Sequence, residues 1–185
     1  MTKQFVVFRE QTFKRWKCAL IWAQVLLLQL TIHKQQNKII MTEYKQQVQI
    51  RWSDLDPNFH LRHSVYYDWG AFCRVSFLNQ YGLTNSLMQE LKVGPIIFRE
   101  EAIFRKEIRS GDEVTIDLAL TKAKRNFSRW SVQHQVTKDG NSLCTVLTVD
   151  GAWLDVVARK LAVPPLKVHE VFSMMPQGKD FQWVD

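Results

Sequence analysis

The chain of 185 residues is 46% apolar, with 7 Gly and 5 Pro, which excludes a collagen-like or disordered protein and predicts one packed domain. Its net charge of +7 suggests a nucleic-acid-binding protein, but residues 1–40 account for +6, with seven Lys or Arg and one acid. The remaining residues hold 18 basic and 17 acidic side chains, so we expect no nucleic-acid partner.

The first forty residues are unlike the rest. Ala19–Ile32 is an apolar run interrupted by two glutamines, and it is shorter than the about 20 residues that span a bilayer. We therefore expect no stable membrane insertion. Because Met41 opens a stretch typical of a natural start, we favour residues 1–40 as an extension foreign to the native protein. A membrane-surface helix and a signal or anchor segment are the alternatives.

The main domain opens with a strand, a loop and a long helix. Val48, Ile50 and Trp52 alternate with polar residues, as in a half-buried strand. A turn-rich loop over residues 53–63 follows. Ser64 is then the expected N-cap of an almost wholly apolar helix over residues 65–81, which we expect other structure to cover on several sides. Residues 85–91 form a short further helix.

Four strands are predicted after the helices, over residues 96–108, 114–120, 130–136 and 143–154, with a bulge at Arg99–Glu101 in the first. A turn is expected at residues 110–112, and Asp139-Gly140 is a strong hairpin signal. Pro164-Pro165 ends the regular part. The order predicts an α+β domain over residues 41–165, with an antiparallel sheet around one long central helix and a tail over 166–185. One helix covers only one sheet face. We therefore expect a second copy or the tail on the other face, and hence a homodimer or homotetramer.

The stretch from Arg51 to Trp69 carries a D-x-D-P-x-x-H element between a strand and a buried helix. Together with the Gly111-Asp112 turn, it resembles the hotdog-fold acyl-CoA thioesterases of the 4-hydroxybenzoyl-CoA thioesterase type, over about residues 45–165. The resemblance implies a hotdog fold, an acyl-CoA substrate and a role in fatty acid metabolism. It implies no cofactor.

The resemblance makes Asp56 the catalytic carboxylate and places the N–H that polarises the thioester carbonyl near His63. A helix N-terminus favours such an oxyanion, and an opposed carboxylate attacks the carbonyl or activates water. His60 and Tyr66 are further site candidates. The basic cluster Lys124, Arg125 and Arg129 is a candidate contact for the phosphates of coenzyme A.

Each assignment has a plainer alternative. Asp54 and Asp56 also suit a turn, and His60 suits loop packing. The alternative for Tyr66 is a structural role in the core, and the alternative for the basic cluster is a solvated turn. His134 is expected to be structural, whereas Asp68 on the helix is a second candidate acid, and Glu100 or Glu101 is a candidate for an interface or the substrate.

Two other functions remain open: a hotdog enoyl-CoA hydratase, and a non-catalytic binder of acyl-CoA or an acyl carrier. No metal site is indicated, because no His or Cys pair has a ligand pattern. The odd count of three cysteines favours a reduced, cytoplasmic location.

Overall fold

The computed structural model describes residues 41–185. The hypotheses about residues 1–40 lie outside this range. Within it, no helix has the length and apolar character needed to cross a membrane.

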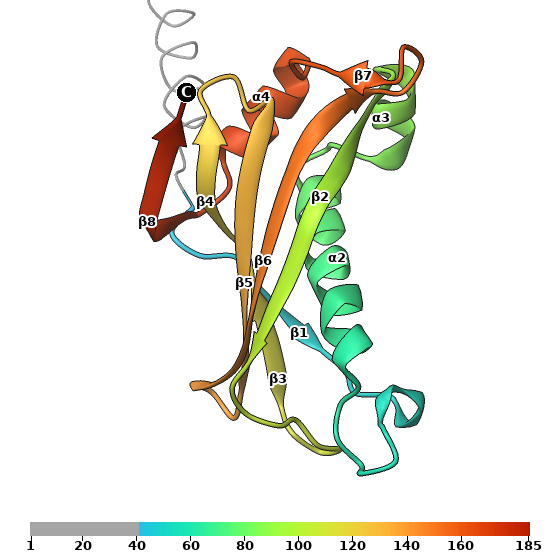
Figure 1. Cartoon of the computed structure of the whole chain (residues 1–185), viewed down its shortest axis with the longest axis vertical. Coiled ribbons are helices and arrows are strands. Elements are labelled where there is room, and N and C mark those ends of the chain that lie inside the picture. The colour runs from blue at the N-terminus through green and yellow to red at the C-terminus, as the bar shows by residue number, and fades with distance from the viewer. Residues whose placement is uncertain (1–40) are drawn as a thin grey trace, which may run out of the picture. The chain divides into compact units, whose positions relative to one another are not determined.

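One curved sheet forms most of the domain (Figure 1). At one side of the sheet, β1 pairs with β3 and β8 pairs with β4. Both β3 and β4 pair with β5, and the sheet continues through β6 to β2. All pairs are antiparallel except β4 with β8, which is parallel. The strands are β1 (Lys45–Val48), β2 (Val93–Phe104), β3 (Val114–Asp117), β4 (Ala119–Lys124), β5 (Arg129–Lys138), β6 (Ser142–Asp155), β7 (Lys160–Leu161) and β8 (Gln177–Val184).

The helices are η1 (Trp52–Asp54), α2 (His63–Gln80), α3 (Asn85–Glu90) and α4 (Leu166–Ser173). α2 runs along one face of the sheet (Figure 1). This confirms the predicted α+β arrangement, with alternate strand residues and the inner side of α2 forming one core.

The hairpin between β5 and β6 is confirmed at Asp139 and Gly140, which both have positive φ, of 50° and 87°. Two such residues in succession make the turn whose twist matches the flanking strands. β2 also contains a bulge, but it lies between Ile97 and Arg99, just before the predicted position at Arg99–Glu101. β2 ends at Phe104, however, so the prediction of a strand reaching Ile108 is wrong at that end.

The single strand predicted over residues 114–120 is divided into β3 and β4. Both parts pair with β5, and the interruption lies where the Asp117 carboxylate accepts a hydrogen bond from the Gln135 N–H. A side chain that accepts a hydrogen bond from a backbone N–H of the neighbouring strand interrupts the regular pairing at that point. The alternation of apolar and polar residues in the sequence does not reveal such an interruption.

α2 begins two residues earlier than expected. Its N-cap is Arg62, which makes no side-chain capping bond, so the prediction of Ser64 as N-cap is wrong. The expectation of cover on several sides is met only in part, because Phe72 and Val75 remain 50% and 43% exposed.

Regular structure continues beyond Pro165, contrary to the prediction. α4 buries Val168, Val171 and Phe172 in the core, and β8 adds a strand beside β4. The outer sheet face is largely polar, with Ser131, Gln133 and Thr148 among its side chains, so that face needs no covering layer.

Candidate functional site

The loop that carries Asp56 is held by its own backbone and by that carboxylate. Oδ1 of Asp56 accepts hydrogen bonds from the N–H groups of Asn58, at 2.8 Å, and His60, at 3.0 Å. The Asp56 N–H donates to the His60 carbonyl at 2.8 Å, and Phe59 adopts a positive φ of 62° between them. The turn role proposed as the plainer alternative is therefore present. Only one carboxylate oxygen is used in it.

Asp54 has a structural role. Its side chain is buried, and it accepts hydrogen bonds from the backbone N–H and the guanidinium of Arg51. Hydrogen bonds from Arg51 hold the pKa of the Asp54 carboxyl below its usual range. The Asp54 carbonyl also accepts from the N–H of Arg62, which fixes the loop to the start of α2.

His60 links the loop to the segment after β2. Its Nε2 lies 3.3 Å from Oε2 of Glu107, and its backbone forms a bridge with Arg109. The next residue, Leu61, donates its N–H to the Ile108 carbonyl at 2.8 Å. These contacts set the position of the Asp56 loop against the sheet.

His63 is the first residue of α2, where backbone N–H groups have no partner within the helix. The Val65 N–H donates a hydrogen bond to the Arg62 carbonyl, but no described residue accepts a hydrogen bond from the N–H of His63 or Ser64. The partial positive charge of the helix N-terminus lies at the same place. Two donors are thus available to a negatively charged oxygen.

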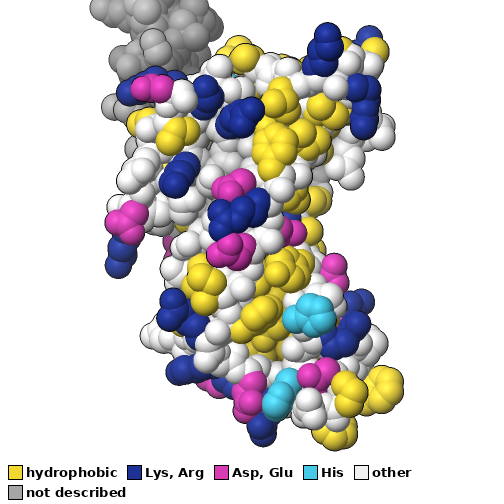
Figure 2. Space-filling model, in the orientation of Figure 1, with side chains coloured by type: hydrophobic (Ala, Val, Ile, Leu, Met, Phe, Trp, Pro, Cys, Tyr) yellow, Lys and Arg dark blue, Asp and Glu magenta, His cyan; other side chains and the backbone are white. Residues whose placement is uncertain are grey.

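A cavity of about 420 Å³ brings together four residues predicted from the sequence: Asp56, His60, His63 and Tyr66. Figure 2 shows histidine side chains at this end of the molecule, among acidic and basic ones. Sequence reasoning missed the other wall, which the end of β2 and the residues after it supply. The charged run after Phe104 marks the end of the strand, but it does not reveal which loop the strand approaches. That wall consists of Phe104, Arg105, Lys106 and Glu107.

Tyr66 and Phe104 close the inner side of this cavity. Their rings meet edge to face with centroids 5.1 Å apart, joining α2 to β2. Burial raises the pKa of Tyr66 to about 12, so the phenol is neutral. Asp68, the second candidate acid, is exposed on α2 and does not line the cavity.

The basic residues Lys124, Arg125 and Arg129 lie away from this cavity, around the turn between β4 and β5. The guanidinium of Arg125 lies over the Trp183 ring, and that of Arg129 lies over Phe98, each at 5.7 Å. Phe98 is six residues from Phe104, so about 20 Å of extended strand separates the Arg129 guanidinium from the Asp56 cavity.

Glu100 belongs to a partly buried polar network and does not line the Asp56 cavity. Arg74 on α2 contacts Oε1 of Glu100 and Nε2 of His134, each at 3.1 Å. This network joins α2 to β2 and β5. Among residues 41–185, no cluster of His, Cys, Asp or Glu has the arrangement of a metal site.

Residues 50–172 match the family model described as the thioesterase-like superfamily. A search of curated proteins gave no match.

A hypothetical protein from Staphylococcus aureus in complex with CoA is 16% identical, with a TM-score of 0.68, over 80% of this chain and 92% of that one. A 1,4-dihydroxy-2-naphthoyl-CoA thioesterase from Synechocystis is 14% identical, with a TM-score of 0.63, over 70% and 94%. A thioesterase from Thermus thermophilus complexed with coenzyme A and Zn is 21% identical, with a TM-score of 0.59, over 72% and 92%. At these identities the likeness establishes the fold, which is the hotdog fold expected from the sequence.

Proposed function

Since this chain belongs to the thioesterase-like superfamily, we propose that it hydrolyses an acyl-CoA thioester to the free acid and CoA. The observation that carries the proposal is that Asp56 and the first turn of α2 line one cavity. Family membership supports thioester hydrolysis in general, and this juxtaposition supports the assignment of roles to residues.

In the proposed reaction the thioester carbonyl lies between Asp56 and α2. The N–H groups of His63 and Ser64 then donate to the carbonyl oxygen as negative charge develops on it. The unpaired oxygen of Asp56 attacks the carbonyl carbon or removes a proton from an attacking water. The hydrogen bonds from Asn58 and His60 hold the carboxylate in one orientation for either route.

CoA is the proposed carrier, because the similar structures from Staphylococcus aureus and Thermus thermophilus are both complexes with coenzyme A. We keep Arg125, Arg129 and Lys124 as candidate contacts for its phosphates. Because these residues lie at the far end of β2 from Asp56, they serve that site best from a second copy of the chain.

A homodimer through β2 is therefore part of the proposal. Among residues 41–185, β2 pairs only with β6, so its other edge has no partner strand in that range. Ile97, Phe98, Ile103 and Phe104 on this strand are each about half exposed, and Figure 2 shows apolar side chains along it. The turn between β4 and β5 lies near the Val93 end of β2, so antiparallel pairing of two β2 edges brings this turn of one copy toward the Phe104 end of the other.

The two alternative functions predict different results in a thiol-release assay. An enoyl-CoA hydratase adds water to a double bond without releasing thiol, and a non-catalytic binder does neither. Asp56 lines a cavity, and one of its carboxylate oxygens has no hydrogen-bond partner among the residues that the structure describes, which favours catalysis over binding alone. A cytoplasmic location and a role in fatty acid metabolism remain part of this proposal.

Asp56→Asn tests the assignment directly. The amide is nearly isosteric but is neither base nor nucleophile, so we expect kcat to fall by about 10²-fold or more. Thiol release should be measured across short, medium, long and aromatic acyl-CoAs. Asp68→Asn is the matched control, because that acid is exposed outside the cavity, and it should keep wild-type turnover. Near-normal thiol release by folded Asp56→Asn would exclude Asp56 as the catalytic carboxylate.

A further inference from the structure

Two aromatic side chains of the segment before α2 protrude into solvent. Trp52, the first residue of η1, is 87% exposed, and Phe59 is 71% exposed. The alternation of Val48, Ile50 and Trp52 predicts a half-buried Trp52, but β1 ends at Val48 and η1 follows it outside the sheet. Figure 1 shows η1 and the loop after it extending beyond the start of α2, and Figure 2 shows apolar side chains at this corner.

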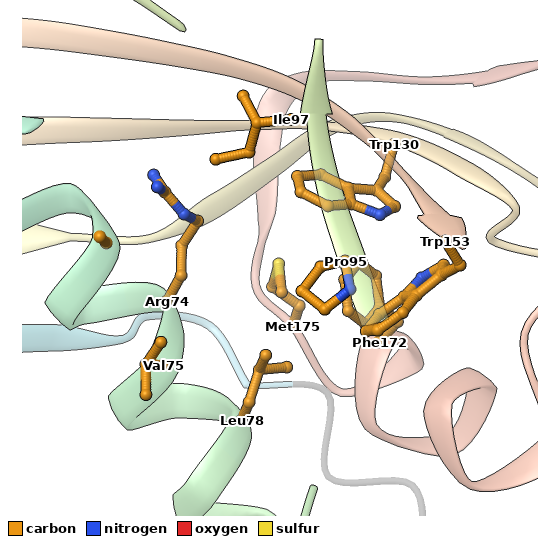
Figure 3. Close-up of a pocket in the computed structure, with 10 residues that line it drawn as sticks. Arg74, Val75, Leu78, Pro95, Ile97, Trp130, Trp153, Phe172 and Met175 are labelled. Atoms are coloured by element: carbon orange, nitrogen blue, oxygen red, sulfur yellow. The ribbon is translucent and has the colours of Figure 1, made fainter. Parts of the chain in front are cut away.

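The tryptophans of the core are packed very differently. Trp130 and Trp153 line a cavity of about 190 Å³ between α2, β2 and α4, and both pack against Phe172, with centroid distances of 5.7 Å and 5.3 Å (Figure 3). Neither Trp52 nor Phe59 belongs to the core that residues 41–185 form. Their exposure is therefore not offset by packing within the domain.

The loop holds Phe59 in a strained conformation. Its φ of 62° lies in the left-handed region, which bulky side chains rarely adopt. The Phe59 N–H donates to the Asp56 carbonyl at 2.9 Å, and the Asp56 carboxylate accepts from Asn58 and His60 on either side. A strained residue that contributes nothing to the core indicates a contact with another molecule.

Exposed cations surround these two rings. Two of them have an acidic partner, since Arg51 bonds to Asp54 and Arg109 to Glu107. The other three form no ion pair with an acid among residues 41–185, so this corner of the domain carries an excess of positive charge. The five cations are Arg51, Arg62, Arg105, Lys106 and Arg109.

Aromatic rings next to Lys and Arg are typical of surfaces that lie at the interface between water and lipid. The rings lie at the level of the headgroups, and the cations attract anionic lipids. A protein partner fits less well, because two aromatic side chains bury roughly 300–500 Å² in total, whereas a stable protein interface takes about 800 Å² from each partner.

We propose that Trp52 and Phe59 attach this protein reversibly to an anionic lipid surface. The rings enter the headgroup region, and the surrounding cations contact the anionic headgroups. Two rings give a reversible attachment, unlike a membrane-spanning helix. Because Phe59 follows Asp56 by three residues, the attached protein has its Asp56 cavity next to the lipid.

Phe59→Gly separates attachment from stability. Glycine adopts positive φ without strain, so the variant should be at least as stable as wild type in urea unfolding. It should nevertheless require roughly tenfold more lipid for half-maximal binding of the full chain to vesicles of phosphatidylserine and phosphatidylcholine. Val157→Ser changes a 68% exposed apolar residue between β6 and β7 and should keep wild-type binding. A less stable Phe59→Gly protein with unchanged binding would give Phe59 a structural role and overturn the proposal.

Trp52 reports its own position in the lipid. The emission of wild type minus that of Trp52→Phe isolates this residue from every other tryptophan. Brominated phosphatidylserine vesicles should quench the isolated emission, and high salt should weaken the quenching. Unquenched Trp52 in vesicle-bound protein, or absence of vesicle binding, would overturn the proposal. So would conversion of a dimer to a monomer by either variant in sedimentation velocity, because the rings then form a contact between copies. Neither measurement uses thiol release, so the outcome is independent of the proposed function.

Discussion

His134 is a completely buried imidazole whose two nitrogens both have partners. Arginine only donates hydrogen bonds, so Nε2 accepts from Arg74, and Nδ1–H donates to the Asp117 carbonyl at 2.6 Å. Burial, and then the charge of Arg74, lower the pKa of His134 to about 3. The ring is therefore neutral in the folded protein throughout the ordinary pH range.

This buried imidazole makes stability depend on pH. The pKa of His134 is lowered from 6.5 in the unfolded chain to about 3 in the folded one. The contribution of the neutral ring to the free energy of unfolding is therefore complete above pH 6.5. It is lost as the pH falls from 6.5 towards 3, because the unfolded chain binds a proton that the folded protein does not. We expect the loss from this group to be about 1.4 kcal/mol per pH unit in that window.

The His134 contribution is measured by urea unfolding of wild type and His134→Gln at several pH values between 7 and 4. The variant should be less stable at pH 7 but should show a shallower pH slope. His63→Gln changes an exposed histidine and should keep the wild-type slope. Equal slopes in wild type and His134→Gln would show that His134 does not carry this dependence.

Single residues were predictable where a local motif defines them. The spacing of Asp56, His60 and His63 around a helix start placed all three near one cavity, and the alternating position of His134 indicated a structural role. Phe104 and Lys106 were not predictable as site residues, because they approach Asp56 through the pairing of His60 and Leu61 with residues 107–109, which lie far away in the sequence. Such long-range pairing leaves no local trace in the sequence.

The position of Gly151 on β6 leaves no room for a side chain. A Cβ at this position of β6 would lie 2.4 Å from the Trp130 ring and 2.7 Å from the Ile96 carbonyl. We expect Gly151→Ala to lower the free energy of unfolding by about 1–3 kcal/mol through this overlap. Gly178→Ala on β8 is the control, since its nearest atom would be at 3.5 Å, and denaturant unfolding compares the two. Equal stability of both variants would contradict the fixed position of Trp130.

Elements with strong periodicity and clear turns were predictable, such as β5, β6 and the hairpin at Asp139-Gly140. α4 and β8 were missed because the pair Pro164-Pro165 was interpreted as an end of regular structure. Proline stops a strand but suits the residues just before a helix, and here Pro165 is the N-cap of α4. β8 has no apolar alternation because it lies at a sheet edge and buries little.

At the scale of the whole molecule, the β2 edge is the proposed dimer contact. Ile103→Lys places a charge at this edge, so we expect the variant to be a monomer and to lose most activity at the shared site. Sedimentation velocity together with thiol release checks both. Val157→Lys is the control, because Val157 is equally apolar and 68% exposed but lies on the turn between β6 and β7. A dimeric, active Ile103→Lys protein would place the contact elsewhere.

The parallel strand β8 lies at the edge opposite β2 and pairs with β4 at Gln177 and again at Gln182–Val184. β1 continues that same edge beside β3 with four residues. Unpaired edges recruit further strands, and long ones lead to fibres. The contact proposed for β2 uses the same edge of both copies and therefore closes on itself in a dimer. Among residues 41–185 the remaining outer edges of the sheet belong to β1 and β8, so no second β2 edge is left to bind a third copy through this contact.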